Sequence, residues 1–254
     1  MKVVAIAKNT FLEAIRDRIL YNLLIFALII IGISTILGNF TIGEQKRIIL
    51  DVGLSSISIF GVLIAVFVGI NLVYKEISKK TIYNIISKPV TRYQFIFGKY
   101  FGLLFTLFVN VFIMAVGFLS ILFYLYGSFN VQVFLAIGLT FMELMIITSI
   151  AIMFSTFSTP TLSAIFTLSV FVIGHLTHDL MLLRNKVESS IVRFMLTGFY
   201  YILPNLDNFN IRNQVVHQLP IKFRYIQYAT SYGVIYLCII FIISIIIFNK
   251  REFK

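Results

Sequence analysis

Charged residues, cysteine and tryptophan are scarce in this sequence. Only 12% of the 254 residues are charged, there is one cysteine, Cys238, and there is no tryptophan. The lone cysteine excludes an internal disulfide. Hydrophobic residues make up 59% of the chain and the mean hydropathy is +0.98, so the polar residues are too few to cover a globule in water. The composition therefore excludes an ordinary soluble domain and predicts a membrane protein.

The sequence also lacks the short motifs of common enzyme sites. It contains no H-E-x-x-H, no G-x-S-x-G and no cysteine pair. It contains no G-x-x-x-x-G-K-[ST] nucleotide-binding loop either, because Gly98-Lys99 is followed by Tyr100 and has no matching upstream glycine. Three histidines and ten acidic residues are scattered along the chain. We therefore predict that the chain is not an enzyme.

Long uncharged runs divide the chain into six predicted membrane spans. A helix needs about 20 apolar residues to cross a bilayer. The uncharged run over 100–142 is too long for one crossing, and a turn at 126–130 divides it. Pro160 suits the first turn of a new helix. The prediction is an all-α, polytopic, single transmembrane domain with spans at residues 19–37, 52–74, 97–124, 131–157, 160–180 and 228–248.

The basic residues lie between the apolar runs. The net charge of +11 would suit nucleic acid, but no basic stripe with interleaved aromatics is present, so we predict a lipid bilayer as partner and no nucleic acid. Thirteen of the 21 Lys and Arg residues fall on the side that holds both termini. Since cytoplasmic loops carry an excess of Lys and Arg, both termini are predicted to be cytoplasmic and residues 181–227 extracytoplasmic, as short interfacial helices that cap the outer side.

Residues 1–18 precede the first span and carry charge. On a helical wheel one face is apolar and the other polar, which predicts an amphipathic helix in the cytoplasmic interface. The alternative is a plain continuation of the first span. The apolar face holds Val4, Ala7, Phe11, Ala14 and Ile15, and the polar face holds Asn9, Glu13, Arg16 and Asp17.

The loop over 75–92 connects the second and third spans. Pro89 disfavours helix at Lys88, so a short helix would end near Ser87. Its apolar side holds Ile82, Ile85 and Ile86, and such an amphipathic helix below the membrane can dock into a groove of a partner protein. The simpler alternative is a solvated basic turn that obeys the positive-inside rule.

This loop resembles the coupling region of ABC type-2 transporter permeases. The family shows an acidic residue, a Thr, a short apolar helix and a Ser-x-Pro-x-x-Arg step that leads to Gly-Lys; it commonly has Gly before the Thr, where Lys80 stands here. The resemblance extends to the amphipathic start, the six spans, the long segment before the last span and the basic tail. A narrower similarity, over 203–210, is to the subgroup that contains nitrous-oxide-reductase maturation permeases. The resemblance of the 75–92 loop to the ABC type-2 family assigns these residues to ATPase coupling: Glu76, Ile77, Ser78, Thr81, Ile82, Ile85, Ser87, Pro89 and Arg92.

The resemblance implies a permease of the cell membrane of a bacterium or archaeon, an exporter driven by ATP. Two copies of a separate ABC ATPase would bind ATP and Mg, and this chain would bind no cofactor. The permease would work as a homodimer or paired with a similar permease. Two alternatives stay open: a secondary transporter or channel without an ATPase, which more often shows paired intramembrane charges, and a membrane anchor or maturation factor without a transport cycle.

Three polar or small-residue features fall inside the predicted spans. Glu143 lies near the middle of the fourth, where a carboxylate is costly; it lines the transport path, holds a dimer interface, or is protonated and hydrogen-bonded to a neighbouring helix. His175 and His178 share a helical face near the outer end of the fifth span, but structural zinc normally needs four ligands, so we predict interfacial polar residues rather than a metal site. The second span carries small residues that suit close helix packing, either internal or at a dimer face: Ser58, Gly61, Ala65 and Gly69.

Overall fold

The chain is helical throughout its described parts. The computed structural model describes residues 2–41, 43–78, 91–127, 130–187 and 189–250, and no strand occurs within them. The predicted all-α fold of a polytopic membrane protein is confirmed. The helices are α1 (Lys2–Ile15), α2 (Arg18–Asn39), α3 (Gln45–Ser78), α5 (Arg92–Tyr126), α6 (Val131–Ser155), α7 (Pro160–His175), α8 (Thr177–Lys186), α9 (Ser190–Ile202), η1 (Leu206–Phe209), α10 (Arg212–Val216) and α11 (Phe223–Lys250).

Five of these helices are long and apolar enough to cross a membrane, namely α2, α3, α5, α6 and α11. The predicted fifth span is shorter than expected, because α7 ends at His175 rather than near Leu180. Its 16 residues extend about 24 Å at 1.5 Å per residue, less than the hydrocarbon core of about 30 Å. The Thr177 hydroxyl donates to the Gly174 carbonyl at 2.7 Å, which satisfies the end of α7 while the chain turns into α8.

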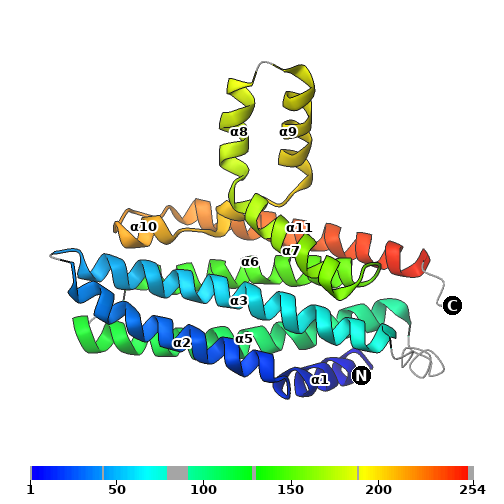
Figure 1. Cartoon of the computed structure of the whole chain (residues 1–254), viewed down its shortest axis with the longest axis horizontal. Coiled ribbons are helices and arrows are strands. Elements are labelled where there is room, and N and C mark those ends of the chain that lie inside the picture. The colour runs from blue at the N-terminus through cyan, green and yellow to red at the C-terminus, as the bar shows by residue number, and fades with distance from the viewer. Residues whose placement is uncertain (1, 42, 79–90, 128–129, 188, 251–254) are drawn as a thin grey trace.

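The long helices form a bundle along one axis, with α3 at its centre. Figure 1 shows α2, α3, α5 and α6 side by side, with α7 and α11 on the other side of α6. In the apolar window of α3, 67% of residues are buried, against 22% for α2. The outward side of α2 carries exposed large side chains such as Ile25, Phe26 and Ile29. These apolar outer faces suit contact with lipid, since a bilayer rather than water surrounds a membrane bundle.

The small residues of α3 are used inside the bundle. A β-carbon at Gly61 would lie 2.6 Å from Leu144 of α6, and one at Gly69 would contact Leu103 of α5. Ala65 is buried as well. Of the two uses predicted for this face, close packing between helices of one chain is the one observed.

Helix α1 is separate from α2, as predicted. The Asp17 carboxylate accepts from the Ile19 N–H at 3.0 Å and caps the start of α2, so the first span does not continue into α1. The packed side of α1 follows most of the predicted apolar face: Ala14 is buried, and Phe11 packs against Phe105 of α5. The prediction differs at Val4, which is exposed, and at Thr10, which is buried.

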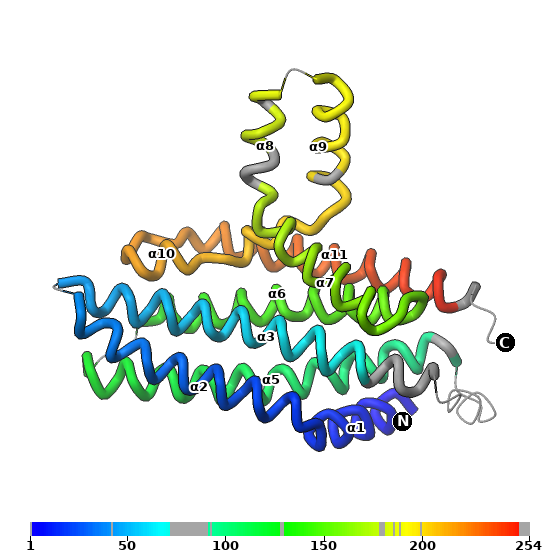
Figure 2. Tube along the Cα trace, in the orientation of Figure 1, coloured from blue at the N-terminus to red at the C-terminus, as the bar shows by residue number. Residues whose placement is uncertain are grey.

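The two helix ends that flank the 75–92 loop lie at one end of the bundle. Figures 1 and 2 show the end of α3, the start of α5, α1 and the end of α11 together at this end. The turn between α2 and α3 lies at the opposite end, as does Gly127, which closes α5 in a left-handed conformation at φ 64°. The predicted arrangement, with both termini and the loop on one side, is therefore the arrangement of the described helices.

Residues 181–227 do not form one capping layer. Figure 1 shows α8 and α9 as a hairpin that stands at a right angle to the long helices. The following segment instead packs into the bundle, where Leu206, Phe209 and Val215 are fully buried. This insertion could not be predicted from the sequence, because the buried residues alternate with polar ones over pieces too short for a clear helical period.

Candidate functional site

The predicted coupling residues are only partly within the described structure. Glu76, Ile77 and Ser78 form the last turn of α3, and Arg92 begins α5. The Thr91 N–H donates to the Gln94 side chain at 3.2 Å, which holds the first turn of α5. The structure therefore places the last turn of α3 and the first turn of α5 at the same end of the bundle. The other predicted coupling residues, Thr81, Ile82, Ile85, Ser87 and Pro89, lie outside the described residues.

Helix α1 is fastened to the first turns of α5, next to this loop. The ring of Phe11 packs edge-on against Phe105 with centroids 4.6 Å apart. Lys99, whose side chain is only 1% exposed, pairs with Glu13 at 3.7 Å. A buried ammonium group needs such a partner. Movement of the loop end of α5 would therefore be transmitted to α1.

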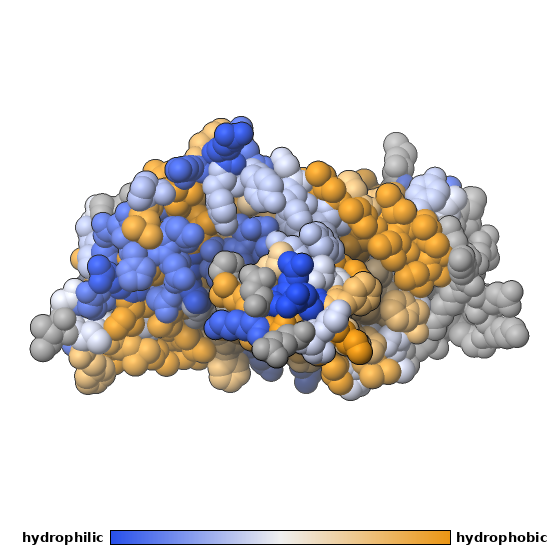
Figure 3. Space-filling view, turned by 90° about the horizontal axis from the view of Figure 1, so that it is seen from above, coloured by the Kyte–Doolittle hydropathy of each residue, from blue (hydrophilic) through white to orange (hydrophobic). Residues whose placement is uncertain are grey.

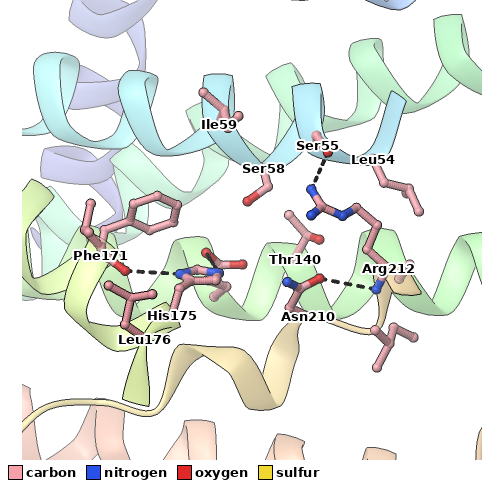
Figure 4. Close-up of a pocket in the computed structure, with 14 residues that line it drawn as sticks. Leu54, Ser55, Ser58, Ile59, Thr140, Phe171, His175, Leu176, Asn210 and Arg212 are labelled. Atoms are coloured by element: carbon pink, nitrogen blue, oxygen red, sulfur yellow. Dashed lines mark hydrogen bonds and ion pairs between the residues drawn. The ribbon is translucent and has the colours of Figure 1, made fainter. Parts of the chain in front are cut away.

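A cavity with both apolar and polar walls lies on the other side of α3. Its volume is about 300 Å³, and it is bounded by α3, α6, α7 and the 210–212 segment. Figure 4 shows Ser58 of α3 and Thr140 of α6 on facing sides of this space, with Asn210 and Arg212 at one end and His175 at the other. The cavity contains the predicted transport-path residue Glu143 and one of the two weak metal candidates, His175.

Glu143 and His175 face each other across the boundary between α6 and α7. Glu143 is 2% exposed, and its Oε1 lies 3.5 Å from Nε2 of His175. The His175 Nδ1 lies 3.1 Å from the Phe171 carbonyl one turn earlier on α7. An acidic group in the middle of a membrane helix usually faces protein or a cavity, and Glu143 lines the cavity beside His175.

Arg212 occupies the opposite end of the cavity. Its Nε lies 3.0 Å from Asp51 of α3, and its guanidinium also donates to Ser55. The backbone N–H of Arg212 donates to the Asn210 side chain at 3.2 Å. The planar guanidinium suits such a bridge because it presents several donors in a fixed geometry. These contacts fasten α10 to α3.

The inserted 203–216 segment is held from α7 and α11. The Asn205 N–H donates to the Tyr232 hydroxyl at 2.9 Å, and the Tyr225 hydroxyl donates to the Asn208 carbonyl at 3.0 Å. A β-carbon at Gly174 would lie 2.8 Å from Leu206, so α7 approaches the segment as closely as a glycine permits. The segment thus forms one wall of the cavity in a fixed position.

The sequence did not indicate that Asp51 and Arg212 belong to one site. They are 161 positions apart; Asp51 lies just before the predicted second span and Arg212 lies within the predicted 181–227 segment, and charged residues are ordinary at both places. His175 and His178, predicted to share a helical face, lie on different helices, because α7 ends between them. Among the described side chains no group of three or more His, Cys, Asp or Glu could hold a metal ion.

The chain matches a known protein family. A protein-family model described as "ABC-2 family transporter protein" matches residues 4–253. This range includes the 75–92 loop and every residue of the cavity. No curated protein matches the chain.

Proposed function

The chain belongs to the ABC-2 family of transporter proteins, and we propose that it is the permease subunit of an ATP-driven exporter whose ATPase binds at residues 75–92. Membership of the family supports pairing with a separate ABC ATPase. The observation that carries the coupling proposal is the common position of the end of α3 and the start of α5, because a protein bound to the loop would act on two membrane helices at once.

The mechanical route from the loop is short. Helix α3 runs without a break from Ser78 to the cavity wall at Ser58, Ser55 and Leu54. Helix α5 carries α1 with it through the Lys99–Glu13 pair and the Phe11–Phe105 contact. A push on the loop by ATP-driven closure of the ATPase pair would therefore shift the wall of the cavity. We assign the cavity, with Glu143 as its buried charged group, to the transport path.

The proposed location is the cell membrane of a bacterium or archaeon, with both termini in the cytoplasm. The orientation rests on the excess of Lys and Arg on the side that holds both termini. Figure 3 shows that the face that bears the hairpin is mostly hydrophilic on the left, where Figure 1 places α10, and hydrophobic on the right, along α7 and α11. The hydrophilic half suits contact with water and the hydrophobic half contact with lipid. We further propose two ATPase copies and a second permease, identical or similar, since closure of an ATPase pair needs a loop on each half.

Co-purification tests the coupling proposal. The full-length permease is expressed with an ABC ATPase from the same genome, and the ATPase recovered per permease is measured. The charge reversal Glu76→Lys is expected to lower recovery at least tenfold and to abolish ATP-dependent transport, because Glu76 is proposed to bind the ATPase.

Glu44→Lys is the matched control, because Glu44 lies just before the opposite end of α3, where it pairs with Arg47 at 2.6 Å. This variant should recover the ATPase as the wild type does. Equal recovery with Glu76→Lys and Glu44→Lys, in proteins inserted to the same level, would contradict the proposal that the loop is the ATPase docking site.

A further inference from the structure

The hydrogen bond made by His175 fixes which of its ring nitrogens carries hydrogen. The Phe171 carbonyl oxygen, 3.1 Å from Nδ1, can only accept, so Nδ1 must be protonated. In a neutral imidazole the other nitrogen, Nε2, is then an acceptor with a lone pair. Nε2, which carries this lone pair, faces Glu143 and lies 3.5 Å from its Oε1.

Two acceptors therefore face each other unless a positive charge lies between them. An ionised Glu143 opposite a neutral His175 repels the Nε2 lone pair, and within the described part of the chain Oε1 accepts no hydrogen bond. At 2% exposure this carboxylate is also costly to leave without a counter-charge. The pair must hold one proton, or a cation must take the place of that proton.

The other charged groups around the pair do not supply this cation. Arg212 of α10 is paired with Asp51 of α3, so the two cancel. Asp207 of η1 acts on Glu143 as a second negative charge. The tyrosines of the packed α5 and α11 helices remain neutral donors: Tyr100 donates to the Met145 carbonyl and Tyr225 to that of Asn208. Among the described side chains, an ionised Glu143 opposite a neutral His175 therefore leaves one uncompensated negative charge in the cavity.

The walls and size of the cavity indicate what kind of cation fits. A volume of about 300 Å³ is far larger than a bare ion needs and equals the lower end of small-molecule sites, roughly 300–1,000 Å³. The walls include the apolar side chains of Ile59, Phe171 and Leu176. Ser58 and Thr140 add hydroxyl oxygens, which accept hydrogen bonds. Acceptors at one point inside apolar walls suit an ammonium group on a small hydrophobic body.

We propose that the cavity between α3, α6, α7 and the 210–212 segment binds a small organic ammonium ion, with the Glu143 carboxylate and the His175 Nε2 as acceptors. The inference rests on the proposed function in that it names the cargo class of the permease. On binding, the ammonium group donates N–H bonds to both acceptors, and the proton that the pair held leaves to solvent. Protons and cargo therefore compete for one place.

Equilibrium binding of radiolabelled benzylamine to the full-length permease in nanodiscs tests this proposal. Benzylamine stays protonated between about pH 5 and pH 8, the range in which a His–carboxylate pair exchanges its proton. Saturable binding is expected at the alkaline end, weakening at least fivefold toward the acidic end. Benzyl alcohol and benzoate, which match it in shape but lack the positive charge, should not compete.

The variant Glu143→Gln keeps the shape of the side chain and should weaken binding at least tenfold, while Glu44→Gln, outside the cavity, should leave it unchanged. Three outcomes would each overturn the proposal: unchanged affinity in Glu143→Gln, equal competition by benzyl alcohol, or affinity that is independent of pH in the wild type. If Glu143→Gln does not insert into the membrane, the pH dependence of the wild type decides.

The ATPase co-purification is scored separately. If benzylamine does not bind but the ATPase co-purifies with the permease, only the cargo class is overturned. If benzylamine binds in a pH-dependent way but no ATPase co-purifies, the binding site is supported and the proposal of an ATP-coupled exporter is contradicted.

Discussion

The backbone of Gly102 on α5 lies against Ala7 on α1 so closely that a β-carbon at position 102 would stand 2.6 Å from the Ala7 carbonyl oxygen. The same β-carbon would stand 2.6 Å from Cβ of Thr10. One of the obstructing atoms belongs to the backbone, so a side-chain rotation cannot relieve the contact. The position of α1 beside the loop end of α5 thus depends on the absence of a side chain at position 102.

We expect Gly102→Ala to destabilise the fold by about 1–3 kcal/mol, the usual cost of overpacking. The measurement is the thermal unfolding midpoint of the purified permease in detergent. Gly138→Ala is the matched control, because nothing lies within 4 Å of a β-carbon there; it should leave the midpoint unchanged or raise it slightly. An equal drop in both variants would mean that the α1–α5 contact is looser than the structure shows.

The Lys99–Glu13 pair should show energetic coupling in a double-mutant cycle. Lys99 is almost fully buried and Glu13 about one-third exposed, so Glu13→Gln removes a counter-charge from a desolvated ammonium group. Lys99→Met should therefore cost less in the Glu13→Gln background than in the wild type, by roughly 0.5–3 kcal/mol. The four proteins are compared by thermal unfolding under one set of conditions, and strictly additive effects would refute the coupling.

Removal of the Tyr232 hydroxyl should loosen the inserted 203–216 segment. Tyr232→Phe deletes the acceptor of the Asn205 N–H, at a cost of about 1–3 kcal/mol if the donor stays buried. Hydrogen exchange of residues 203–210 is expected to speed up relative to the wild type. Tyr228→Phe, at an exposed position of the same helix, serves as the control and should leave the exchange rates as they are.

Arg212→Lys tests the cross-link between α10 and α3. The variant keeps the positive charge, but a lysine cannot reproduce the fixed pair of contacts to Asp51 and Ser55. ATP-dependent transport should fall several-fold at normal membrane levels, because one cavity wall is no longer held in place. Arg224→Lys, at an exposed position on α11, should transport as the wild type does, and equal activity of both variants would show that the cross-link is dispensable.

The features predicted from the sequence are those that depend on local chemistry. The uncharged runs located α2, α3, α5, α6 and α11, because a membrane span is set by length and apolarity along a single stretch. The separation of α1 from α2 was predicted from the amphipathic pattern of residues 1–18, and the structure shows that Asp17 caps the start of α2. Glu143 could be identified for the same reason, because a carboxylate inside an apolar run is recognised from that run alone, without knowing which residue it contacts.

The features that the sequence could not supply are pairings between distant positions. By itself it determined the class of fold, the major spans, the family and the buried carboxylate. Only the tertiary structure decided that α7 stops at His175, that its imidazole faces Glu143, and that Arg212 reaches Asp51 across 161 positions. The physical reason is that hydrophobicity is a property of each residue in its own stretch, whereas a charge or a donor acquires its role from the group that packing places opposite it.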